Sequence, residues 1–245
     1  LSRPDLKMVI MSATLDVAKL KNTLPDTVCY EVPGQLYPLD LIYQKKEMKL
    51  QTRQDFIDNV CETTLSCAMN LAATESILVF LPGKSEIERC SEKFSELQIK
   101  NNIQNIQICK LHGQIPLNEQ RLVLQKTQNK KIIFSTNIAE SSLTVDGVRV
   151  VIDSGLQRKM STHANTGFSQ LEMGRISKAS ATQRSGRAAR QAHGKCYRLW
   201  NKMDEISMPD HEPAEILTAD LTSSLLFLAQ QKISDFQSFS WFESP

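Results

Sequence analysis

Residues 131–155 read KIIFSTNIAESSLTVDGVRVVIDSG, and two short apolar runs in this stretch are each followed at once by small polar residues. The run Lys131–Phe134 is followed by Ser135, and the run Val148–Ile152 is followed by Asp153. Apolar runs of this length that stop at turn-forming residues are typical of strands buried on both faces, as in parallel sheets. The stretch therefore predicts two strands of a parallel sheet with polar groups at their carboxyl ends.

The same kind of apolar run recurs along the rest of the chain, with helical periodicity between several of the runs. The other expected strands are Lys7–Met11, Leu39–Tyr43, Ile77–Leu81, Ile106–Leu111 and Lys195–Leu199. The expected helices are Arg53–Leu71, Ser85–Ile99 and Asn118–Lys126. Ser85 is expected to cap the second helix, because Glu88 follows three residues later. The alternation of strands and helices predicts an α/β fold, a parallel sheet with helices on both faces.

The amino-acid composition limits the kinds of protein to which this chain can belong. The 245 residues, 41% of them hydrophobic, suffice for one large core and the start of a second. The net charge of +2 is too small to indicate nucleic-acid binding by itself, and no apolar run approaches a membrane span, so no membrane partner is expected. The six cysteines form no CxxC pair, so we expect no metal site and reduced thiols in a cytoplasmic protein. The start at Leu1, without an initiator Met or a signal-peptide pattern, indicates a piece of a longer protein.

Two regions depart from the alternating pattern. Asp204–Asp220 contains six acidic residues and no Lys or Arg, and the apolar run Leu221–Ala229 follows it. This change predicts a boundary near Trp200–Pro209 and a short helical element beyond it. In Met160–Glu172 a Thr-Gly pair separates two short extended segments, which predicts a hairpin that projects from the sheet, with a simple surface loop as the alternative.

A basic stretch lies between these two regions. Met173–Met203 contains eight Lys or Arg residues and no Asp or Glu, and within it QRSGRAAR places Arg184, Arg187 and Arg190 at three-residue spacing. Residues at this spacing share one face of a helix, so the three guanidinium groups are expected to point the same way. Each guanidinium is then expected to bind two phosphate oxygens at once, in a bidentate contact. A solvated basic face is the alternative. Arg184 is also expected to brace the helix through a carboxylate elsewhere in the fold.

Small polar residues follow four of the expected strands. The clusters are Ser12–Thr14, Pro82–Lys84, Ser135–Asn137 and Asp153–Gly155. In an open parallel sheet the ligand crevice lies outside the carboxyl ends of the strands, so these clusters are expected to converge at one edge. Each cluster taken alone is also typical of a turn or a helix cap.

Together, the clusters and the arginine sequence resemble the second RecA-like lobe of superfamily 2 helicases of the DEAH/DExH type. The matching segments are Ser12–Thr14 for motif III, Phe80–Ile87 for motif IV, Ser135–Gly147 for motif V and Gln183–Arg190 for motif VI. The resemblance covers nearly the whole chain, and the tail Glu212–Leu217 is similar to that of bacterial HrpB-type proteins. It implies an ATP-dependent RNA helicase in three parts: residues 1–20 as the tail of the first lobe, 21–203 as the second RecA-like lobe, and 204–245 as the start of a winged-helix or ratchet-type region.

The resemblance implies roles for individual residues in ATP hydrolysis. Arg187 and Arg190 correspond to arginine fingers, and Gln183 corresponds to a residue that helps to place the attacking water. Positions that approach the nucleotide are Thr136, Asp146 and Gly186, with the adenine near Val123 or Leu124. An arginine supplied from across a cleft stabilises the charge that spreads over the phosphate oxygens during phosphoryl transfer. The implied cofactor is ATP with Mg²⁺, held mainly by the first lobe.

The resemblance also implies a groove for single-stranded RNA, or DNA. The positions that match backbone-binding residues are Gly83, Gly113, Thr136 and Asn137. Uncharged donors suit sequence-independent contacts with phosphate and sugar. Ser12 and Thr14 match residues that couple the two lobes, and the hairpin over Met160–Glu172 corresponds to a wedge or strand guide. The expected partners are therefore single-stranded RNA and the upstream RecA-like lobe.

The chain departs from the family pattern at Ala189, where motif VI usually has Gly, and at Ser141, where motif V usually has Thr. Since Ala does not tolerate a positive φ, a slight shift of the fingers is expected. Neither a G-x-x-x-x-G-K-[ST] phosphate loop nor a D-E-x-H box occurs, so the chain alone is not expected to hydrolyse ATP. Two alternatives stay open: a non-catalytic nucleic-acid-binding module with the same fold, and an unrelated α/β module whose basic helix is only a solvated face.

Overall fold

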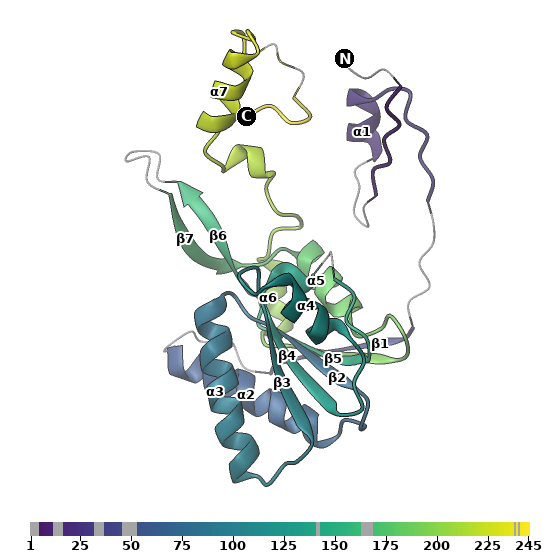
Figure 1. The fold of residues 1–245 in the computed structure, drawn as a ribbon, viewed down its shortest axis with the longest axis vertical. Coiled ribbons are helices and arrows are strands. Elements are labelled where there is room, and N and C mark those ends of the chain that lie inside the picture. Colours follow the sequence, from purple (N-terminus) through teal and green to yellow (C-terminus); the bar gives the residue numbers. More distant parts are fainter. Residues whose placement is uncertain are drawn as a thin grey trace. The chain divides into compact units, whose positions relative to one another are not determined.

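The computed structural model describes residues 5–11, 17–31, 37–45, 53–140, 143–162, 169–237, 239 and 241–245. The chain divides into two compact units. The larger unit is Gln35–Glu212, and the smaller unit combines Leu1–Gly34 with Pro213–Pro245. Figure 1 shows the helices and strands of both units.

The larger unit is built on a six-stranded parallel sheet (Figure 1). Its strands are β1 (Leu39–Tyr43), β2 (Ser76–Phe80), β3 (Ile106–Leu111), β4 (Lys130–Ser135), β5 (Val148–Asp153) and β8 (Gly194–Arg198). Their order across the sheet is β1-β8-β5-β2-β4-β3, so β2 lies between β5 and β4. Six of the seven expected strands are therefore present within one residue of their expected bounds, and the parallel α/β sheet predicted from the sequence is confirmed.

Alternate strand residues pack on opposite faces of this sheet. Ile77 belongs to the core cluster that includes residues of helices α2 (Arg53–Met69) and α3 (Lys84–Lys100). Leu78 belongs to a second cluster, against which helix α4 (Leu117–Leu124) packs. Full burial of an apolar side chain of this size stabilises a fold by about 1.5–3 kcal/mol, so covering both faces is strongly favoured. The prediction of helices on both faces is confirmed.

The three expected helices are present, but α3 begins differently from the prediction. Its N-cap residue is Gly83, which makes no side-chain cap bond, and Ser85 lies in the first turn. The hydroxyl oxygen of Ser85 accepts a hydrogen bond from Arg53 Nη2 at 2.6 Å, so it does not cap the helix and the prediction is wrong. The remaining helices of the larger unit are η1 (Asn137–Ala139), α5 (Lys178–Gly186) and α6 (Lys202–Ile206).

An antiparallel hairpin projects from the larger unit (Figure 1). Its strands are β6 (Leu156–Thr162) and β7 (Ser169–Arg175), and they pair along their full length. The hairpin predicted over Met160–Glu172 is therefore confirmed, and the alternative of a simple surface loop is excluded. The hairpin is longer than expected, since β6 begins shortly after β5 ends and β7 continues almost to the start of the next helix. The predicted Thr-Gly turn lies outside the described residues.

The smaller unit contains short helices and an extended apolar segment. Its helical elements are α1 (Val17–Thr23), η2 (Glu215–Leu217) and α7 (Thr222–Gln230), so the predicted C-terminal helical element is present. The prediction of a strand at Lys7–Met11 is wrong, because no strand in the described parts of the chain pairs with it. Instead the segment is extended and exposed, with Val9 exposed by 80% and Met11 by 88%. No helix among the described residues is long and apolar enough to cross a membrane.

Candidate functional site

Two segments singled out by the motifs lie side by side, Leu143–Gly147 before β5 and Arg187–Gln191 after α5. The bonds between them run from Arg187 Nη1 to the Leu143 carbonyl (2.8 Å), from Arg190 Nη1 to Thr144 Oγ1 (3.0 Å), from Gln191 Nε2 to Asp146 Oδ1 (2.8 Å) and from the Gly147 N–H to Gln191 Oε1 (3.0 Å). These bonds fix both arginines against the loop that leads into β5.

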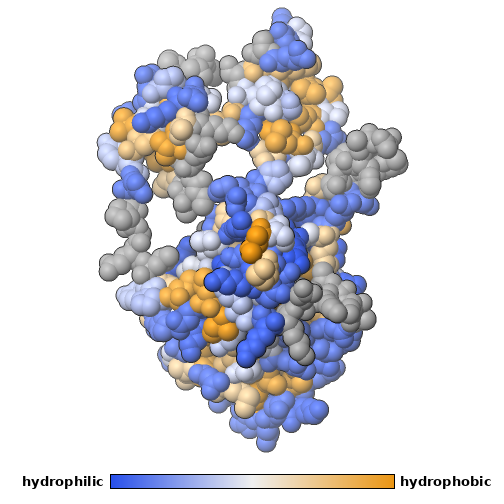
Figure 2. All heavy atoms as spheres, turned by 180° about the vertical axis from the view of Figure 1, so that it is seen from behind, coloured by the Kyte–Doolittle hydropathy of each residue, from blue (hydrophilic) through white to orange (hydrophobic). Residues whose placement is uncertain are grey.

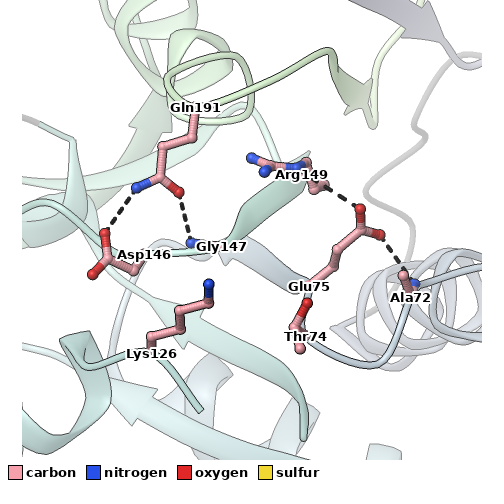
Figure 3. Close-up of a pocket in the computed structure, with 8 residues that line it drawn as sticks. All are labelled: Ala72, Thr74, Glu75, Lys126, Asp146, Gly147, Arg149 and Gln191. Atoms are coloured by element: carbon pink, nitrogen blue, oxygen red, sulfur yellow. Dashed lines mark hydrogen bonds and ion pairs between the residues drawn. The ribbon is translucent and has the colours of Figure 1, made fainter. Parts of the chain in front are cut away.

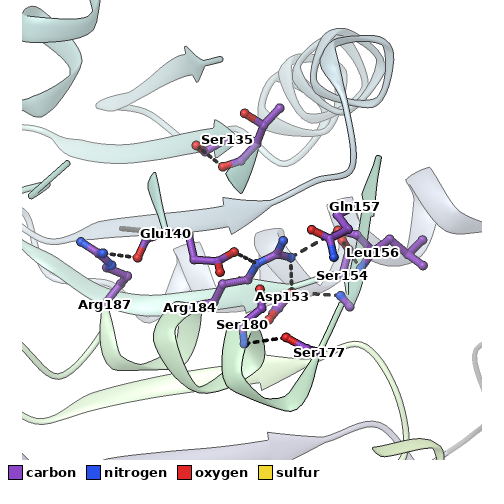
Figure 4. A network of polar contacts seen from close by, with 12 residues as sticks. Ser135, Glu140, Asp153, Ser154, Leu156, Gln157, Ser177, Ser180, Arg184 and Arg187 are labelled. Carbon is purple, nitrogen blue, oxygen red and sulfur yellow. Dashed lines mark hydrogen bonds and ion pairs between the residues drawn. The ribbon is translucent and has the colours of Figure 1, made fainter. Parts of the chain in front are cut away.

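Arg184 lies inside the fold (Figure 4). Its guanidinium donates to Glu140 Oε2 at 2.9 Å, to Asp153 Oδ1 at 3.0 Å and to the Leu156 carbonyl at 3.3 Å. The side chain is 1% exposed, and its guanidinium carbon lies 5.0 Å from the centre of the Phe80 ring. Burial disfavours the charge, but the two carboxylates more than offset burial and hold the pKa of Arg184 above its usual value. Arg184 therefore braces the fold through carboxylates, as expected.

The three arginines do not share one helix face, and that prediction is wrong. Helix α5 ends at Gly186, and Arg187 is its C-cap residue. The chain leaves the helix at this point and buries Ala188 in the core cluster on the α4 side of the sheet. Arg190 therefore lies beyond the helix and is exposed, whereas Arg184 points into the core.

Arg187 is held by neutral acceptors. Its guanidinium donates to the carbonyl oxygens of Leu143 and Glu140, and the residue is 7% exposed. Burial, and to a smaller extent the charge of Arg190, lower the pKa of Arg187 to about 10. Arg187 thus stays charged at neutral pH in a site that would favour an additional anionic partner.

Acids from elsewhere in the chain neutralise much of the basic stretch. Its ion pairs are Arg175–Asp204 (3.4 Å), Lys178–Asp210 (2.8 Å), Arg184 with Glu140 and Asp153, and Arg198–Glu205 (2.6 Å). Sequence reasoning anticipated a carboxylate partner for Arg184 but missed the other pairs, although a basic stretch directly followed by an acidic one was the available signal. Among the residues that the structure describes, the arginines of the stretch that pair with no carboxylate are Arg187 and Arg190.

The predicted backbone-binding positions lie at the carboxyl edge of three adjacent strands. Gly83 follows β2, Thr136 and Asn137 follow β4, and Gly113 follows β3. Gly113 and Asn137 are exposed, and a Cβ added at Gly113 would meet nothing within 4 Å. Gly83 is buried, because the side chain of Arg158 covers it. The structure thus brings the four positions to one edge, with three of them open to a ligand at least in part.

Thr136 and Asp146, which were both predicted to approach the nucleotide, lie at opposite edges of the sheet. Thr136 follows the carboxyl end of β4, whereas Asp146 precedes the amino end of β5. Asp146 lines a pocket of about 500 Å³ together with Lys126, Arg149 and Gln191 (Figure 3). A strand of six residues spans about 20 Å, so one ribose does not reach both positions. Asp146 lies beside the arginines, and Thr136 lies with the backbone-binding positions.

The sequence left open whether Val123 or Leu124 contacts the adenine. Both residues are half-buried and pack against the core. The ammonium group of Lys131 donates to the Val123 carbonyl at 2.8 Å and so fixes the end of α4. Leu122, which sequence reasoning did not consider, is 63% exposed. Its exposure adds an apolar surface next to the two residues that were considered.

The other predicted site residues lie in or near the last turn of α5. Gln183 is half-buried, and Gly186 is the last residue of the helix. Ala189 has no positive φ, since the non-glycine residues with positive φ in the described ranges are Asn102, Asn105 and Lys232. The backbone at Ala189 therefore suits an alanine, and the slight shift of the fingers expected from it stays a prediction. The predicted positions Ser12, Thr14 and Ser141 lie outside the described residues.

The site lies within a segment that matches a known family. Residues 57–192, more than half of the chain, match the model of the helicase conserved C-terminal domain. The chain belongs to the helicase C-terminal domain family. Both arginines and all four carboxyl-edge positions fall within the matched segment of this domain.

The helicase domain is also similar over nearly its whole length to named RNA helicases. It is 33% identical to the probable ATP-dependent RNA helicase DHR2 of Saccharomyces cerevisiae over 99% of this chain and 33% of that protein. It is 36% identical to the ATP-dependent RNA helicase HrpB of Escherichia coli over 99% of this chain and 29% of that protein. The crystal structure of the E. coli DEAH/RHA helicase HrpB matches with a TM-score of 0.87 at 34% identity, over 99% of this chain and 30% of that chain. The resemblance to HrpB-type DEAH helicases is confirmed, and the chain spans about a third or less of these relatives.

Proposed function

We propose that this chain is the C-terminal motor lobe of an ATP-dependent RNA helicase of the DEAH/DExH type. It supplies two arginine fingers to ATP that is held mainly by an upstream lobe, and half of a groove for single-stranded RNA. The observation that carries this proposal is the way in which the guanidinium groups of Arg187 and Arg190 are bound. Both are fixed by carbonyl and hydroxyl oxygens of the neighbouring loop, and their charges stay free for an anion.

The two arginines suit phosphoryl transfer. Charge spreads over the phosphate oxygens in the transition state, and a guanidinium that is already in place stabilises it without reorganisation. Arg187 is preorganised by two carbonyl oxygens, while Arg190 is exposed and able to reach a ligand in an opposing lobe. Gln183, half-buried on α5, is proposed to help place the attacking water.

The residues of this chain fit the triphosphate of ATP but not its Mg²⁺. Within the described ranges there is no group of three or more His, Cys, Asp or Glu residues that could hold a metal. The acids beside the arginine sequence already have partners, since Glu140 and Asp153 pair with Arg184 and Asp146 accepts a hydrogen bond from Gln191. The magnesium ligands and the phosphate loop are therefore proposed to belong to the upstream lobe.

The extended segment Lys7–Met11 supports such a partner lobe. Met8, Val9 and Met11 are exposed by 65%, 80% and 88%, and an extended apolar run of this kind suits a strand of another sheet. We therefore retain residues 1–20 as the tail of a first lobe, 21–203 as the second lobe and 204–245 as the start of a winged-helix or ratchet-type region. A cytoplasmic location likewise stays a prediction.

The carboxyl edge of the sheet supplies the proposed RNA groove. Gly113, Thr136 and Asn137 offer uncharged groups there, which suits contacts with the sugar and phosphate backbone of any sequence. The β6–β7 hairpin is proposed to act as a wedge or strand guide at this groove. Ser12 and Thr14 are proposed to couple the two lobes.

The test is RNA-stimulated ATP hydrolysis by the complete helicase that carries this lobe, measured beside the chain alone. We expect hydrolysis that rises with single-stranded RNA in the complete helicase and none in the chain alone. Turnover by the chain alone, in a preparation free of contaminating enzyme, contradicts the division of the site between two lobes. A complete protein that binds RNA but never hydrolyses ATP supports a non-catalytic nucleic-acid-binding module instead.

A further inference from the structure

The base of the hairpin is bound to α3 on one side. Arg158 of β6 donates from Nη2 to both carboxylate oxygens of Glu86, at 3.2 and 3.4 Å. Glu86 lies in the first turn of α3 and is 1% exposed, so its charge has to be paired inside the protein. Arg53 at the start of α2 is its second partner, at 2.7 Å. The shared carboxylate holds β6 against the first turn of α3.

The position of Arg158 also explains why the residue that precedes α3 is a glycine. A Cβ on Gly83 would lie 2.7 Å from Nε of Arg158 and 3.1 Å from Oε2 of Glu86. The backbone of Gly83 is extended, with φ of −166°, so its conformation does not require glycine. The missing side chain instead makes room for Arg158. The turn proposed to face RNA is thus in direct contact with the hairpin.

The base of the hairpin is bound to α5 on its other side. Glu212 Oε1 accepts hydrogen bonds from Gln157 Nε2 at 2.7 Å and from the backbone N–H of Ser177 at 2.8 Å, and Lys159 pairs with the other carboxylate oxygen. Ser177 is the N-cap of α5, the helix that leads to the arginine fingers. Because side chains alternate along a strand, Gln157 and Lys159 point away from the face that carries Arg158.

We propose that Arg158 and Glu212 are positioning residues that couple the hairpin to the motor. Through them, strand β6 links the turn at Gly83, at the edge proposed to bind RNA, to α5, which leads to the proposed arginine fingers. This inference rests on the proposed function and assigns the residues that make the hairpin move with the ATP cycle. Its signature is a loss of strand separation without a loss of ATP hydrolysis.

The test uses Arg158→Ala and Glu212→Gln in the complete helicase. Removing Arg158 leaves Glu86 paired with Arg53, and Gln at 212 retains an acceptor for Ser177, so both variants should fold. We expect RNA-stimulated ATP turnover within about twofold of wild type and duplex unwinding per ATP lowered about tenfold, in the range seen for coupling residues. Lys93→Ala is the matched control, since Lys93 also forms an ion pair from α3, with Asp58 at 3.3 Å, at 35% exposure against 34% for Arg158.

A double variant sharpens the test. If both anchors are needed to couple the hairpin, then Arg158→Ala and Glu212→Gln combined lower unwinding no further than either change alone. Equal losses of ATPase and unwinding, or unwinding at the wild-type level, overturn the proposal. A parallel loss of RNA affinity also overturns it, since Arg158 would then contact phosphate directly. A wild-type helicase without RNA-stimulated hydrolysis contradicts the proposed function instead, before any variant is compared.

Discussion

Arg184 and Arg187 are three residues apart in one motif and lie in opposite environments. Arg184 is fully buried and pairs with the carboxylates of Glu140 and Asp153. Arg187 and the exposed Arg190 bind only carbonyl and hydroxyl oxygens in the described structure. The charge of Arg184 is neutralised within the fold, whereas the charges of the other two meet no carboxylate in the described structure, which suits their proposed role as fingers.

The end of a helix creates this difference. Within α5 the side chain of Arg184 is directed at the sheet, where two acids meet it. After Gly186 the chain turns, and Arg187 and Arg190 are directed at the loop before β5. Equal spacing in the sequence therefore does not imply equal roles, because the backbone conformation changes between the residues.

The largest expected effect is that of Arg184→Met on folding. The change leaves two carboxylates without their partner, and breaking a buried ion pair costs about 3–5 kcal/mol. Urea unfolding of the chain, followed by circular dichroism, measures this loss. Arg190→Met is the matched control and should change the unfolding free energy by less than about 0.5 kcal/mol, since that side chain is exposed. Similar losses in the two variants contradict the contrast between the two environments.

Glu205→Gln tests the neutralisation of the basic stretch. Burial alone would raise the pKa of Glu205, but hydrogen bonds and the charge of Arg198 more than offset burial and lower the pKa below its usual value. In the unfolded chain the pKa of a glutamate is about 4.3. A carboxylate whose pKa is lower in the folded protein stabilises the fold above that pH, and this stabilisation is lost as the pH falls through the pKa of the folded protein. We expect the variant to be less stable by about 1–3 kcal/mol at pH 7, and the difference from wild type to shrink steadily as the pH falls below about 4.3. Unfolding free energies measured at a series of pH values check this, and a difference that does not shrink in acid contradicts the ion pair as the cause.

Lys84→Ala should have the smallest effect, on RNA binding. Lys84 is exposed and follows Gly83 at the carboxyl edge. Loss of one phosphate contact reduces the slope of log affinity against log salt by about 0.7 for a single strand. Titration of a fluorescent oligonucleotide into the chain measures the slope, and Arg190→Ala should leave it unchanged without nucleotide. If only Arg190→Ala lowers the slope of log affinity against log salt, Arg190 binds RNA rather than ATP.

The sheet was predictable from the sequence because its strands are buried on both faces and read as apolar runs with polar ends. The carboxyl-edge positions Gly83, Gly113 and Asn137 came instead from the resemblance to the helicase family, and they lie shortly after the ends of β2, β3 and β4. The segment Lys7–Met11 has the same apolar signal but pairs with no strand in the part of the chain that the structure describes, and a sequence pattern does not show whether a pairing partner is present.

The partners of charges that lie far apart in the sequence were not predictable. Arg158 pairs with Glu86 across 72 sequence positions, and only the folded chain brings such a pair together. The end of α5 was equally hard to predict, because the sequence QRSGRAAR has good helix formers beyond Gly186. Burial of Ala188 against the sheet overrides that local preference.

Single-turnover ATP hydrolysis with saturating RNA tests the role of the free arginines most directly. In the complete helicase, Arg187→Ala and Arg190→Ala each remove a charge that is proposed to act mainly in the transition state. We predict a fall in turnover of at least about a hundredfold for each, with RNA affinity in the absence of nucleotide changed by less than about twofold. Near-normal turnover in well-folded variants would contradict the assignment of these two arginines as fingers.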